Sequence, residues 1–255
     1  LIDKIKTLKL KHTGKRLSTE IPNIIKVNEG VLWLLGLIIA EGDAQYNNRL
    51  LRLRITSEPS LLEKAKKIIK EDFNVNSFIH RKKDFNAETL LIPSRLLCLI
   101  FKYSFKLNIE KKAAEKSIPE WLFELPQHKL KYFIAGFWNG DGYHAISRPK
   151  NRLLFATSSK ELANNLSLLL LRFGLVSSIY PVKLKNIKGN WHQPYRVEAA
   201  GLNIDNPLDL EKVIQNLNAP IWNDLAFATI KEIEEIKLDS TTKVYDFEVN
   251  SAQTP

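Results

Sequence analysis

The sequence contains one cysteine and no long hydrophobic run. Cys98 stands in an apolar segment (Leu-Leu-Cys-Leu-Ile-Phe), so a disulfide within the chain and a cysteine-ligated metal site are both excluded. The longest wholly apolar stretch, Val31 to Ala40, is half the roughly 20 residues that a membrane span needs, and no signal peptide opens the chain. We therefore expect an intracellular, cytoplasmic protein with no membrane partner.

Apolar surface and positive charge are both plentiful. The 255 residues are 44% hydrophobic and include 5 Trp, 12 Phe and 7 Tyr, which argues against disorder and suffices for one large domain or two small ones. Lys and Arg outnumber Asp and Glu by 38 to 28, a net charge of +10. Arg52 and Arg54 alternate with the apolar residues of 51–55, and Lys183 and Lys185 alternate with apolar neighbours in the same way. On strands this pattern places the cations on one face, where they could follow a nucleic-acid backbone; ordinary solvated surface charge is the alternative.

Most of the chain repeats at an offset of about 100 residues. The segment WLLGLIIAEGD (33–43) is matched by YFIAGFWNGDG (132–142), and an Ile-Pro pair precedes each. After each segment come a strand pattern ending in Thr-Ser, an amphipathic helix pattern, two strand candidates and a final helix pattern. Ser60 and either Ser158 or Ser159 are expected to cap the middle helices. Each half is thus predicted to be αββαββα. In the first half we expect the later helices at 60–73 and 94–105 and the second strand pair at 75–83 with 88–92. In the second half we expect these helices at 160–173 and 207–217 and the strand pair at 176–185 with 194–200.

The expected fold class is mixed α/β (α+β), with two pseudo-symmetric halves, antiparallel sheets and the two motif helices paired at the centre. The expected divisions are a basic N-terminal extension (1–20), a first half (21–105), a linker (106–128), a second half (129–220) and a C-terminal extension (221–255).

Each motif helix has a glycine in its middle and another at its end. A buried helical glycine costs about 1 kcal/mol relative to alanine, so a close helix–helix approach must offset it. Gly36 and Gly136 are expected to let the two helices pack backbone to backbone about a pseudo-two-fold axis. Gly42 and Gly142 are expected to end the helices in a left-handed turn.

An acidic residue comes directly before each terminal glycine. Glu41 and Asp141 would face the negative ends of two helix dipoles and would repel each other. A divalent cation between them would remove both penalties, and hard cations such as Mg²⁺ prefer carboxylate and carbonyl oxygens. The pattern indicates a metal-dependent nuclease that acts on pseudo-symmetric duplex DNA.

The arrangement resembles the LAGLIDADG family of homing endonucleases in its monomeric, two-motif form. The resemblance rests on LLGLIIAEG (34–42), IAGFWNGDG (134–142), the Ile-Pro lead-ins and the Thr-Ser strand ends. It implies a saddle whose antiparallel sheets lie in the major groove of a long asymmetric double-stranded DNA target. It also implies a nucleoid-associated monomer that hydrolyses both strands across the minor groove and leaves short 3′ overhangs.

The resemblance further implies the residues of the site. Glu41 and Asp141 are the expected metal ligands, with the backbone carbonyls of Ala40 and Gly140 in addition. Mg²⁺ is the expected cofactor, with Mn²⁺ as a substitute, and Ca²⁺ is expected to support binding without efficient cleavage. Lys116, just before the second Ile-Pro pair, resembles a basic family residue that polarises water or stabilises the leaving phosphate.

Basic residues on the strands and their loops are the expected DNA contacts. His144 could also approach the metal site, although a solvent-facing strand histidine is the simpler interpretation. Trp33 and Trp138 are expected in the core rather than stacked on bases. Ile39 and Asn139 stand where the motif name has an acid, but that position varies in the family, so activity is still expected. The expected DNA-binding set is Arg49, Arg52, Arg54, Arg81, Lys82, Lys83, His144, Arg152, Lys183, Lys185, Lys188 and Arg196.

Other functions stay open. The same scaffold could belong to a non-cleaving nucleic-acid-binding protein, either an RNA maturase or a regulator. Residues 243–249 (KVYDFEV) resemble a strand of the intein splicing domain, so the chain could be the endonuclease part of a larger intein or carry a vestige of one; a strand that only pads the fold is the third interpretation. Splicing needs an N-terminal Cys or Ser and a terminal His-Asn, whereas residue 1 is Leu and the chain ends Gln-Thr-Pro. We expect no splicing chemistry from these residues.

Overall fold

The computed structural model describes residues 7–8, 20–47, 50–81, 88–144, 152–182, 193–200, 221–222 and 225–226. The chain divides into two compact units, Leu1–Ala219 and Pro220–Pro255. In the second unit the described residues form two short antiparallel strands, β11 (Ile221–Trp222) and β12 (Leu225–Ala226). The expected closing helix at 207–217 and the intein-like segment at 243–249 lie outside the described residues.

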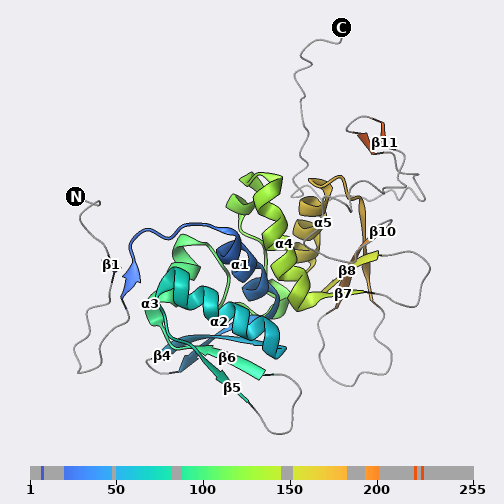
Figure 1. Cartoon of the computed structure of the whole chain (residues 1–255). Helices are drawn as coiled ribbons and strands as arrows, with labels where there is room; N and C mark the ends of the chain where they lie inside the picture. Colours follow the sequence, from blue (N-terminus) through green and yellow to red (C-terminus); the bar gives the residue numbers. More distant parts are fainter. Residues whose placement is uncertain are drawn as a thin grey trace, which may run out of the picture. The chain divides into compact units, whose positions relative to one another are not determined.

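The first half of the larger unit is one four-stranded antiparallel sheet with its helices (Figure 1). The strand order is β3-β4-β6-β5, so the two hairpin-like pairs meet through β4 and β6. The elements are α1 (Glu29–Glu41), β3 (Gly42–Asn47), β4 (Leu50–Ser57), α2 (Pro59–Phe73), β5 (Phe78–His80), β6 (Glu88–Ile92), α3 (Arg95–Leu99) and a π-helical turn η2 (Ile100–Ser104).

The second half repeats this topology. Its sheet has the order β7-β8-β10-β9, and the register repeats as well: Gly42 pairs with Ile55 in the first half, and Gly142 pairs with Phe155 in the second. The mixed α/β fold with duplicated antiparallel sheets is therefore confirmed. The elements are α4 (Gln127–Asp141), β7 (Gly142–His144), β8 (Arg152–Thr157), α5 (Lys160–Leu171), β9 (Ser177–Pro181) and β10 (Tyr195–Ala200).

The segment that joins the halves contains two 3₁₀ turns, η3 (Ala113–Glu115) and η4 (Glu120–Glu124). It is tied to the first sheet, because the Ala44 N–H on β3 donates to the Ile109 carbonyl at 2.8 Å. Near the N-terminus, β1 (Thr7–Leu8) pairs with β2 (Ile21–Pro22). None of the helices in the described ranges has the length and apolarity to cross a bilayer.

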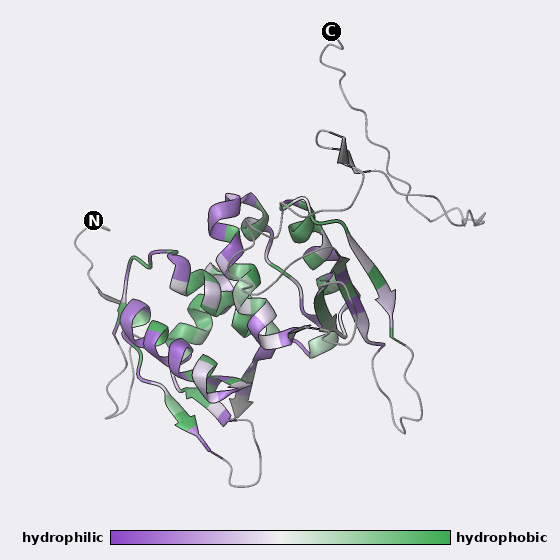
Figure 2. Ribbon diagram, turned by 45° about the vertical axis from the view of Figure 1, so that its right-hand side comes forward, coloured by the Kyte–Doolittle hydropathy of each residue, from purple (hydrophilic) through white to green (hydrophobic). Residues whose placement is uncertain are grey.

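The core forms where α1, α4 and the inner faces of the sheets meet. Every residue of α1 from Val31 to Ala40 is buried, as expected for a helix enclosed on all sides. On β4, Leu51, Leu53 and Ile55 are buried while the two arginines between them lie on the other face, which confirms the alternation read from the sequence. In Figure 2, hydrophobic residues are concentrated in the helices at the centre of the larger unit.

Two local expectations differ in outcome. The middle helix of the first half begins at Pro59 after Glu58, and the Ser60 hydroxyl donates to the Glu58 carboxylate at 2.8 Å instead of capping the helix. Proline is favoured at the first helical position because its missing N–H has no partner there in any case. In the second half Ser159 is the cap, as expected, and accepts from the Leu162 N–H at 3.1 Å.

Candidate active site at the paired helix ends

The two motif helices touch through their central glycines. A Cβ placed on Gly36 would lie 2.6 Å from the Phe137 backbone nitrogen and still closer to the Phe133 carbonyl oxygen. A Cβ on Gly136 would lie 2.7 Å from the Trp33 carbonyl carbon. Real Cβ atoms do not approach this closely, so α1 and α4 lie backbone to backbone only because both positions are glycine.

The terminal glycines are needed for another reason than expected. Gly42 has φ −80° and ψ 140°, and Gly142 has φ −85° and ψ 149°, so both are extended and not left-handed. Each helix passes directly into a strand, which requires an extended residue. A Cβ on Gly42 would lie 2.9 Å from the Ile38 side chain, and one on Gly142 would clash with the ring of Trp138. The expected left-handed turn is therefore wrong, and crowding against the preceding helical turn is the reason for glycine.

The close helix approach brings the two acids to one place. Glu41 is the last residue of α1 and Asp141 the last of α4, and both are partly buried. The helix ends are in contact here, because a Cβ on Gly140 would lie 2.6 Å from the Ala40 Cβ and 2.9 Å from the Glu41 Cγ. Each carboxylate thus stands at the negative end of a helix dipole, which disfavours its charged form.

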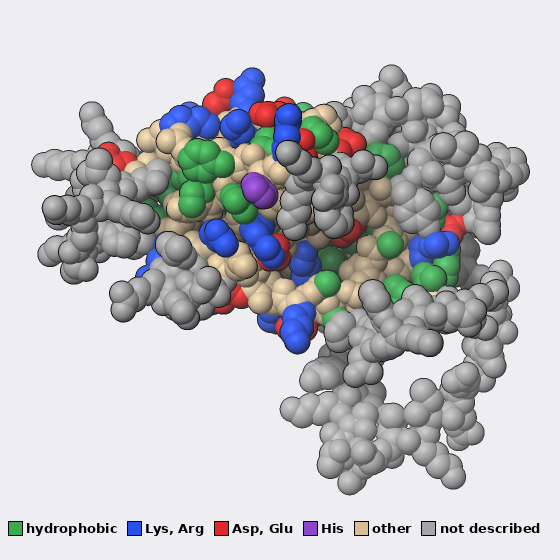
Figure 3. All heavy atoms as spheres, turned by 90° about the horizontal axis from the view of Figure 1, so that it is seen from below, with side chains coloured by type: hydrophobic (Ala, Val, Ile, Leu, Met, Phe, Trp, Pro, Cys, Tyr) green, Lys and Arg blue, Asp and Glu red, His purple; other side chains and the backbone are tan. Residues whose placement is uncertain are grey.

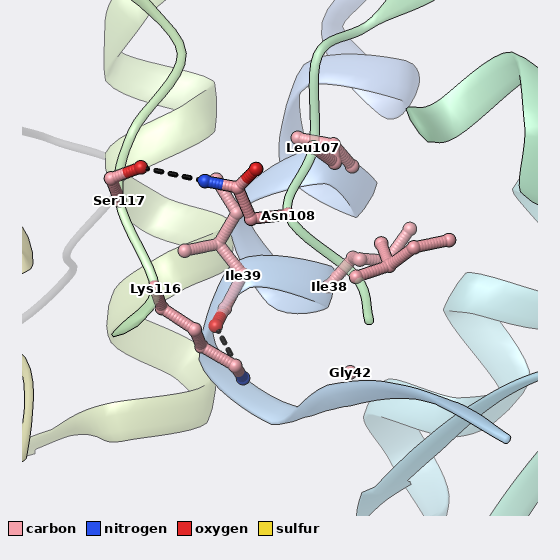
Figure 4. Close-up of a pocket in the computed structure, with 8 residues that line it drawn as sticks. Ile38, Ile39, Gly42, Leu107, Asn108, Lys116 and Ser117 are labelled. Carbon is pink, nitrogen blue, oxygen red and sulfur yellow. Dashed lines mark hydrogen bonds between the residues drawn. The ribbon is translucent and has the colours of Figure 1, made fainter. Parts of the chain in front are cut away.

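Lys116 reaches the same place from the linker. Its Nζ donates to the Ile39 carbonyl at 2.8 Å (Figure 4). It also donates to the Ala40 carbonyl at 2.9 Å, in the same last turn of α1. The expectation placed Ala40 among the metal-ligating carbonyls; in this structure that carbonyl accepts from Lys116. The side chain crosses from the second half's lead-in segment to the first half's motif helix.

The three ionisable groups perturb one another. Burial, together with the nearby Glu41 charge, raises the pKa of Asp141 to about 7, and Lys116 opposes both effects. Burial also raises the pKa of Glu41, again opposed by Lys116. Burial lowers the pKa of Lys116, while the charges of Asp141, Glu41 and Asp43 act in the opposite direction. The ionisation of both acids is disfavoured although one cation lies beside them, so a further positive charge at this site would be stabilising.

The donor set fits a hard divalent cation. Its side chains offer only carboxylate oxygens, and the neighbouring donors are backbone carbonyls, which Mg²⁺ and Ca²⁺ prefer over the nitrogen and sulfur ligands of zinc sites. Among the described residues no group of three or more His, Cys, Asp or Glu is positioned to hold a metal. The protein would therefore supply two carboxylates and leave the other coordination positions to carbonyls, water and substrate oxygens.

A small pocket lies beside Lys116, between the last turn of α1 and the linker (Figure 4). Its walls are mainly apolar, and one of its few polar pairs is a hydrogen bond from Asn108 Nδ2 to Ser117 Oγ at 2.8 Å. The Lys116 side chain thus forms part of the pocket wall beside the helix end. The mainly apolar walls provide few hydrogen-bonding groups for a polar ligand. Its lining residues are Ile38, Ile39, Gly42, Leu107, Asn108, Ile109, Lys116 and Ser117.

The expected DNA-binding arginines on β4 are held by partners on β3. Arg54 forms an ion pair with Asp43 at 2.5 Å, and Arg52 donates twice to the Gln45 side-chain oxygen, at 2.6 and 2.9 Å. Asp43 and Gln45 were not anticipated, because they are recognised only through the register that places them directly opposite these arginines. On the face seen in Figure 3, Lys and Arg side chains lie among Asp and Glu side chains, so the charge is mixed and not uniformly positive there.

Two more expected contacts are partnered in a similar way. Arg81 pairs with Glu88 at 2.9 Å, and the Arg196 guanidinium lies over the Tyr180 ring at 5.9 Å. The remaining members of the expected set lie outside the described residues or, for His144 and Arg152, have only their backbone described. Those outside are Arg49, Lys82, Lys83, Lys183, Lys185 and Lys188.

The two tryptophans of the motif helices differ in burial. Trp33 is 1% exposed, and its indole N–H donates to the Asn139 side chain at 2.9 Å. Asn139, which replaces an acid of the motif name, thus joins the two helices. Trp138 is only partly buried and packs against Gly142.

Residues 129–204 match the family model described as a LAGLIDADG-like domain. This range begins in α4 and runs through the second sheet, so the second half carries that domain.

Curated relatives match the chain over segments of much longer proteins. The chain is 34% identical over 116 residues to the probable translation initiation factor IF-2 of Methanocaldococcus jannaschii, covering 46% of this chain and 9% of that protein. It is 28% identical over 167 residues to the glutamine–fructose-6-phosphate aminotransferase of the same organism, covering 66% and 14%. It is 34% identical over 71 residues to a DNA gyrase subunit of Mycobacterium gordonae, covering 28% and 13%. The chain therefore spans between 9% and 14% of the length of these relatives.

Solved structures share the fold. I-DmoI in complex with DNA and manganese matches with a TM-score of 0.50 and 19% identity, covering 75% of this chain and 97% of that chain. Full-length WhiA from Thermatoga maritima matches with a TM-score of 0.50 and 14% identity, covering 74% and 56%. At this identity the likeness concerns the fold alone. The fold of this chain is that of the LAGLIDADG homing endonucleases.

Proposed function

We propose that the chain is a site-specific, divalent-metal-dependent endonuclease that hydrolyses both strands of a long asymmetric DNA duplex across the minor groove and leaves short 3′ overhangs. The observation that carries this proposal is the meeting of Glu41 and Asp141 at two touching helix ends, beside the Lys116 ammonium. The I-DmoI structure, solved with DNA and manganese, supports it through the shared fold. On this proposal the chain works inside the cell, on chromosomal DNA, as a monomer.

Each residue of the site has a role in this chemistry. Glu41 and Asp141 would hold the metal, with Mg²⁺ the expected ion and Mn²⁺ a substitute. A divalent cation bound there supplies an activated water and neutralises phosphate charge. Lys116 places a cation at the end of α1, where it can stabilise charge that develops on a phosphate oxygen. Arg52 and Arg54 would follow the DNA backbone along the first sheet.

The relatives' names support an intein origin. A translation factor, an aminotransferase and a gyrase subunit have no activity in common, and each matches the chain over a small part of its length. The shared segment is therefore not the source of their named activities. We infer that it is an insert carried by unrelated proteins, and that this chain is the endonuclease part of a larger intein, which the resemblance of residues 243–249 also favours.

A shared fold does not fix an activity, so a second candidate is a non-cleaving nucleic-acid-binding protein on the same scaffold. The presence of an acid at both helix ends favours the endonuclease, because a protein that only binds has no use for two repelling carboxylates at its centre. The two candidates differ in one measurable property, which is metal-dependent strand cleavage.

The test is a selection of cleaved molecules from a randomised duplex library with Mg²⁺, followed by cleavage assays on the selected site. Glu41→Gln and Asp141→Asn should each lower the cleavage rate at least about 1,000-fold, because each removes a negative ligand of the metal. Both variants should still bind the site. The matched control is Glu29→Gln, which removes an exposed carboxylate at the other end of α1 and should cleave as the parent does.

One result would refute the proposed site and another the proposed activity. Full activity in the Glu41→Gln, Asp141→Asn double variant would place the chemistry elsewhere in the protein. Specific binding with no cleavage in Mg²⁺ or Mn²⁺ would refute the endonuclease and favour the binding protein; tighter binding to an intron RNA than to any duplex would identify it as a maturase. Ca²⁺ should support binding of the selected duplex without efficient cleavage.

A further inference from the structure

Lys116 is anchored to one half of the protein and acts at the other. Its ammonium contacts the last turn of α1, in the first half. Its backbone is held by α5, in the second half: the Ser159 hydroxyl donates to the Lys116 carbonyl at 2.7 Å. Two residues further on, the Ile118 N–H donates to the Asn165 side-chain oxygen at 2.9 Å. The lysine therefore spans the interface between the halves.

Ser159 is held more firmly than capping requires. It is 1% exposed, its hydroxyl accepts from the Leu162 N–H and donates to Lys116, and its own N–H donates to the Thr157 hydroxyl at 3.1 Å. Ser94 caps α3 in the same way, and its hydroxyl accepts from the Leu97 N–H at 3.2 Å. Within the described part of the chain, the Ser94 hydroxyl makes no hydrogen bond to a residue near the site. The bond to Lys116 is thus a second task of Ser159.

A lysine needs such an anchor. Its side chain has a flexible four-carbon stem, so the position of the ammonium depends on where the backbone is fixed. The Lys116 backbone is extended and lies between two short 3₁₀ turns, which do not fix it by themselves. Displacement of a reacting group by about 1 Å can cost about 100-fold in rate.

We propose that Ser159 and Asn165 are positioning residues for Lys116 in the cleavage reaction: their hydrogen bonds to the Lys116 carbonyl and the Ile118 N–H set where the ammonium meets the end of α1. This inference rests on the proposed function. It also makes the lysine's position depend on the alignment of the two halves, since the anchor belongs to one half and the contacted carbonyls to the other.

The experiment measures single-turnover cleavage of the selected duplex at saturating protein. Ser159→Ala and Asn165→Ala should each slow cleavage about tenfold, as expected for a displaced catalytic group, with duplex affinity changed less than twofold. Ser94→Ala is the control for loss of a helix cap, and Asn164→Ala, at the exposed neighbouring position of α5, is the control for the helix surface. Both controls should cleave as the parent does. Ser159→Ala should lower the melting temperature somewhat more than Ser94→Ala, because it removes the bond to the Lys116 carbonyl as well as the helix cap.

A double-variant cycle separates positioning from general stability. In a Lys116→Met background, Ser159→Ala should cause no further slowing, because the group that it positions is gone. With Lys116 present, Ser159→Thr keeps the hydroxyl and should cleave at most of the parent's rate. Tenfold slowing by Ser159→Ala in the Lys116→Met background, or cleavage equal to that of Ser94→Ala, would overturn the inference. If Ser159→Ala does not fold, the comparison of Asn165→Ala with Asn164→Ala tests the inference: equal cleavage by these two variants would overturn it. Absence of cleavage by the parent refutes the proposed function, whereas a cleaving parent with unaffected Ser159 and Asn165 variants refutes this inference alone.

Discussion

Gly36→Ala tests the geometry on which the site depends. The added Cβ would lie 2.6 Å from the Phe137 nitrogen and closer to the Phe133 carbonyl oxygen, whereas real Cβ atoms stay beyond 3.0 Å. Both obstacles are backbone atoms of α4, so no side chain can turn aside and the helices must separate. Overpacking of a close-packed core costs about 1–3 kcal/mol, occasionally more, while alanine regains about 1 kcal/mol of helix propensity. We expect a net loss of about 2 kcal/mol in the free energy of unfolding.

Gly30→Ala is the matched control, in the first turn of the same helix. Its Cβ would meet the Ile68 side chain at 3.3 Å and the Asn28 side chain at 3.4 Å, and both can yield slightly. This variant should be neutral or stabilised by up to about 1 kcal/mol, because only the propensity gain applies. Urea unfolding followed by tryptophan fluorescence measures both variants. Equal stability of Gly36→Ala and Gly30→Ala would refute the backbone-to-backbone packing of α1 and α4, and with it the pairing of the two acids.

Three further predictions concern the charged groups. In metal-free buffer the free energy of unfolding should fall as the pH rises from about 4 to about 7. The pKa of Asp141 is raised from 3.8 to about 7 in the folded chain. Between these pH values the folded chain therefore keeps a proton that the unfolded chain has lost, which destabilises the fold as the pH rises. Asp141→Asn should remove the part of this slope that comes from Asp141, leaving the part due to the raised pKa of Glu41, and should gain up to about 4 kcal/mol at pH 8 in urea unfolding. A variant with the parent's pH profile would contradict this prediction. Asp43→Ala should change the free energy of unfolding by less than about 1 kcal/mol, since its pair with Arg54 is well exposed. It should also steepen the log–log salt dependence of DNA binding, measured by fluorescence anisotropy, by about 0.9, because Arg54 is then free to contact a phosphate. An unchanged slope would argue against that contact. Lys116→Met should slow cleavage of one strand more than the other, so that nicked plasmid accumulates, because the described hydrogen bonds of the Lys116 ammonium are both with the end of α1. Equal slowing of both strands would show that the lysine serves both sites.

The repeat in the sequence was sufficient to predict the duplicated fold. The offset between the two motifs equals the offset between the ladder pairs Gly42–Ile55 and Gly142–Phe155, because each half folds by the same local rules of helix, turn and alternating strand. Alternation on β4 also predicted correctly which side chains face the core. Local signals of this kind are contained in a few consecutive residues.

Details that depend on distant residues were not accessible from the sequence. The conformation of Gly42 is set by its crowding against Ile38 and by the strand that follows, so the usual helix-ending rule failed there. The pairing of Arg54 with Asp43 depends on strand register. The anchoring of Lys116 by Ser159 joins residues 43 positions apart, and nothing in the spacing of Ser159 from its own helix distinguishes it from an ordinary cap.

The site as a whole combines what the repeat supplies with what it does not. Duplication provides two equivalent helix ends, and glycine at the crossing fixes how closely their acids approach. Burial at this contact, together with the Glu41 charge, raises the pKa of Asp141, and a divalent cation there would favour the charged form again. Lys116 breaks the equivalence, because it comes from the linker between the halves and contacts the carbonyls of Ile39 and Ala40 at one helix end. On the proposed function, this lysine at one helix end suits an asymmetric duplex, because the two helix ends then differ as the two half-sites do.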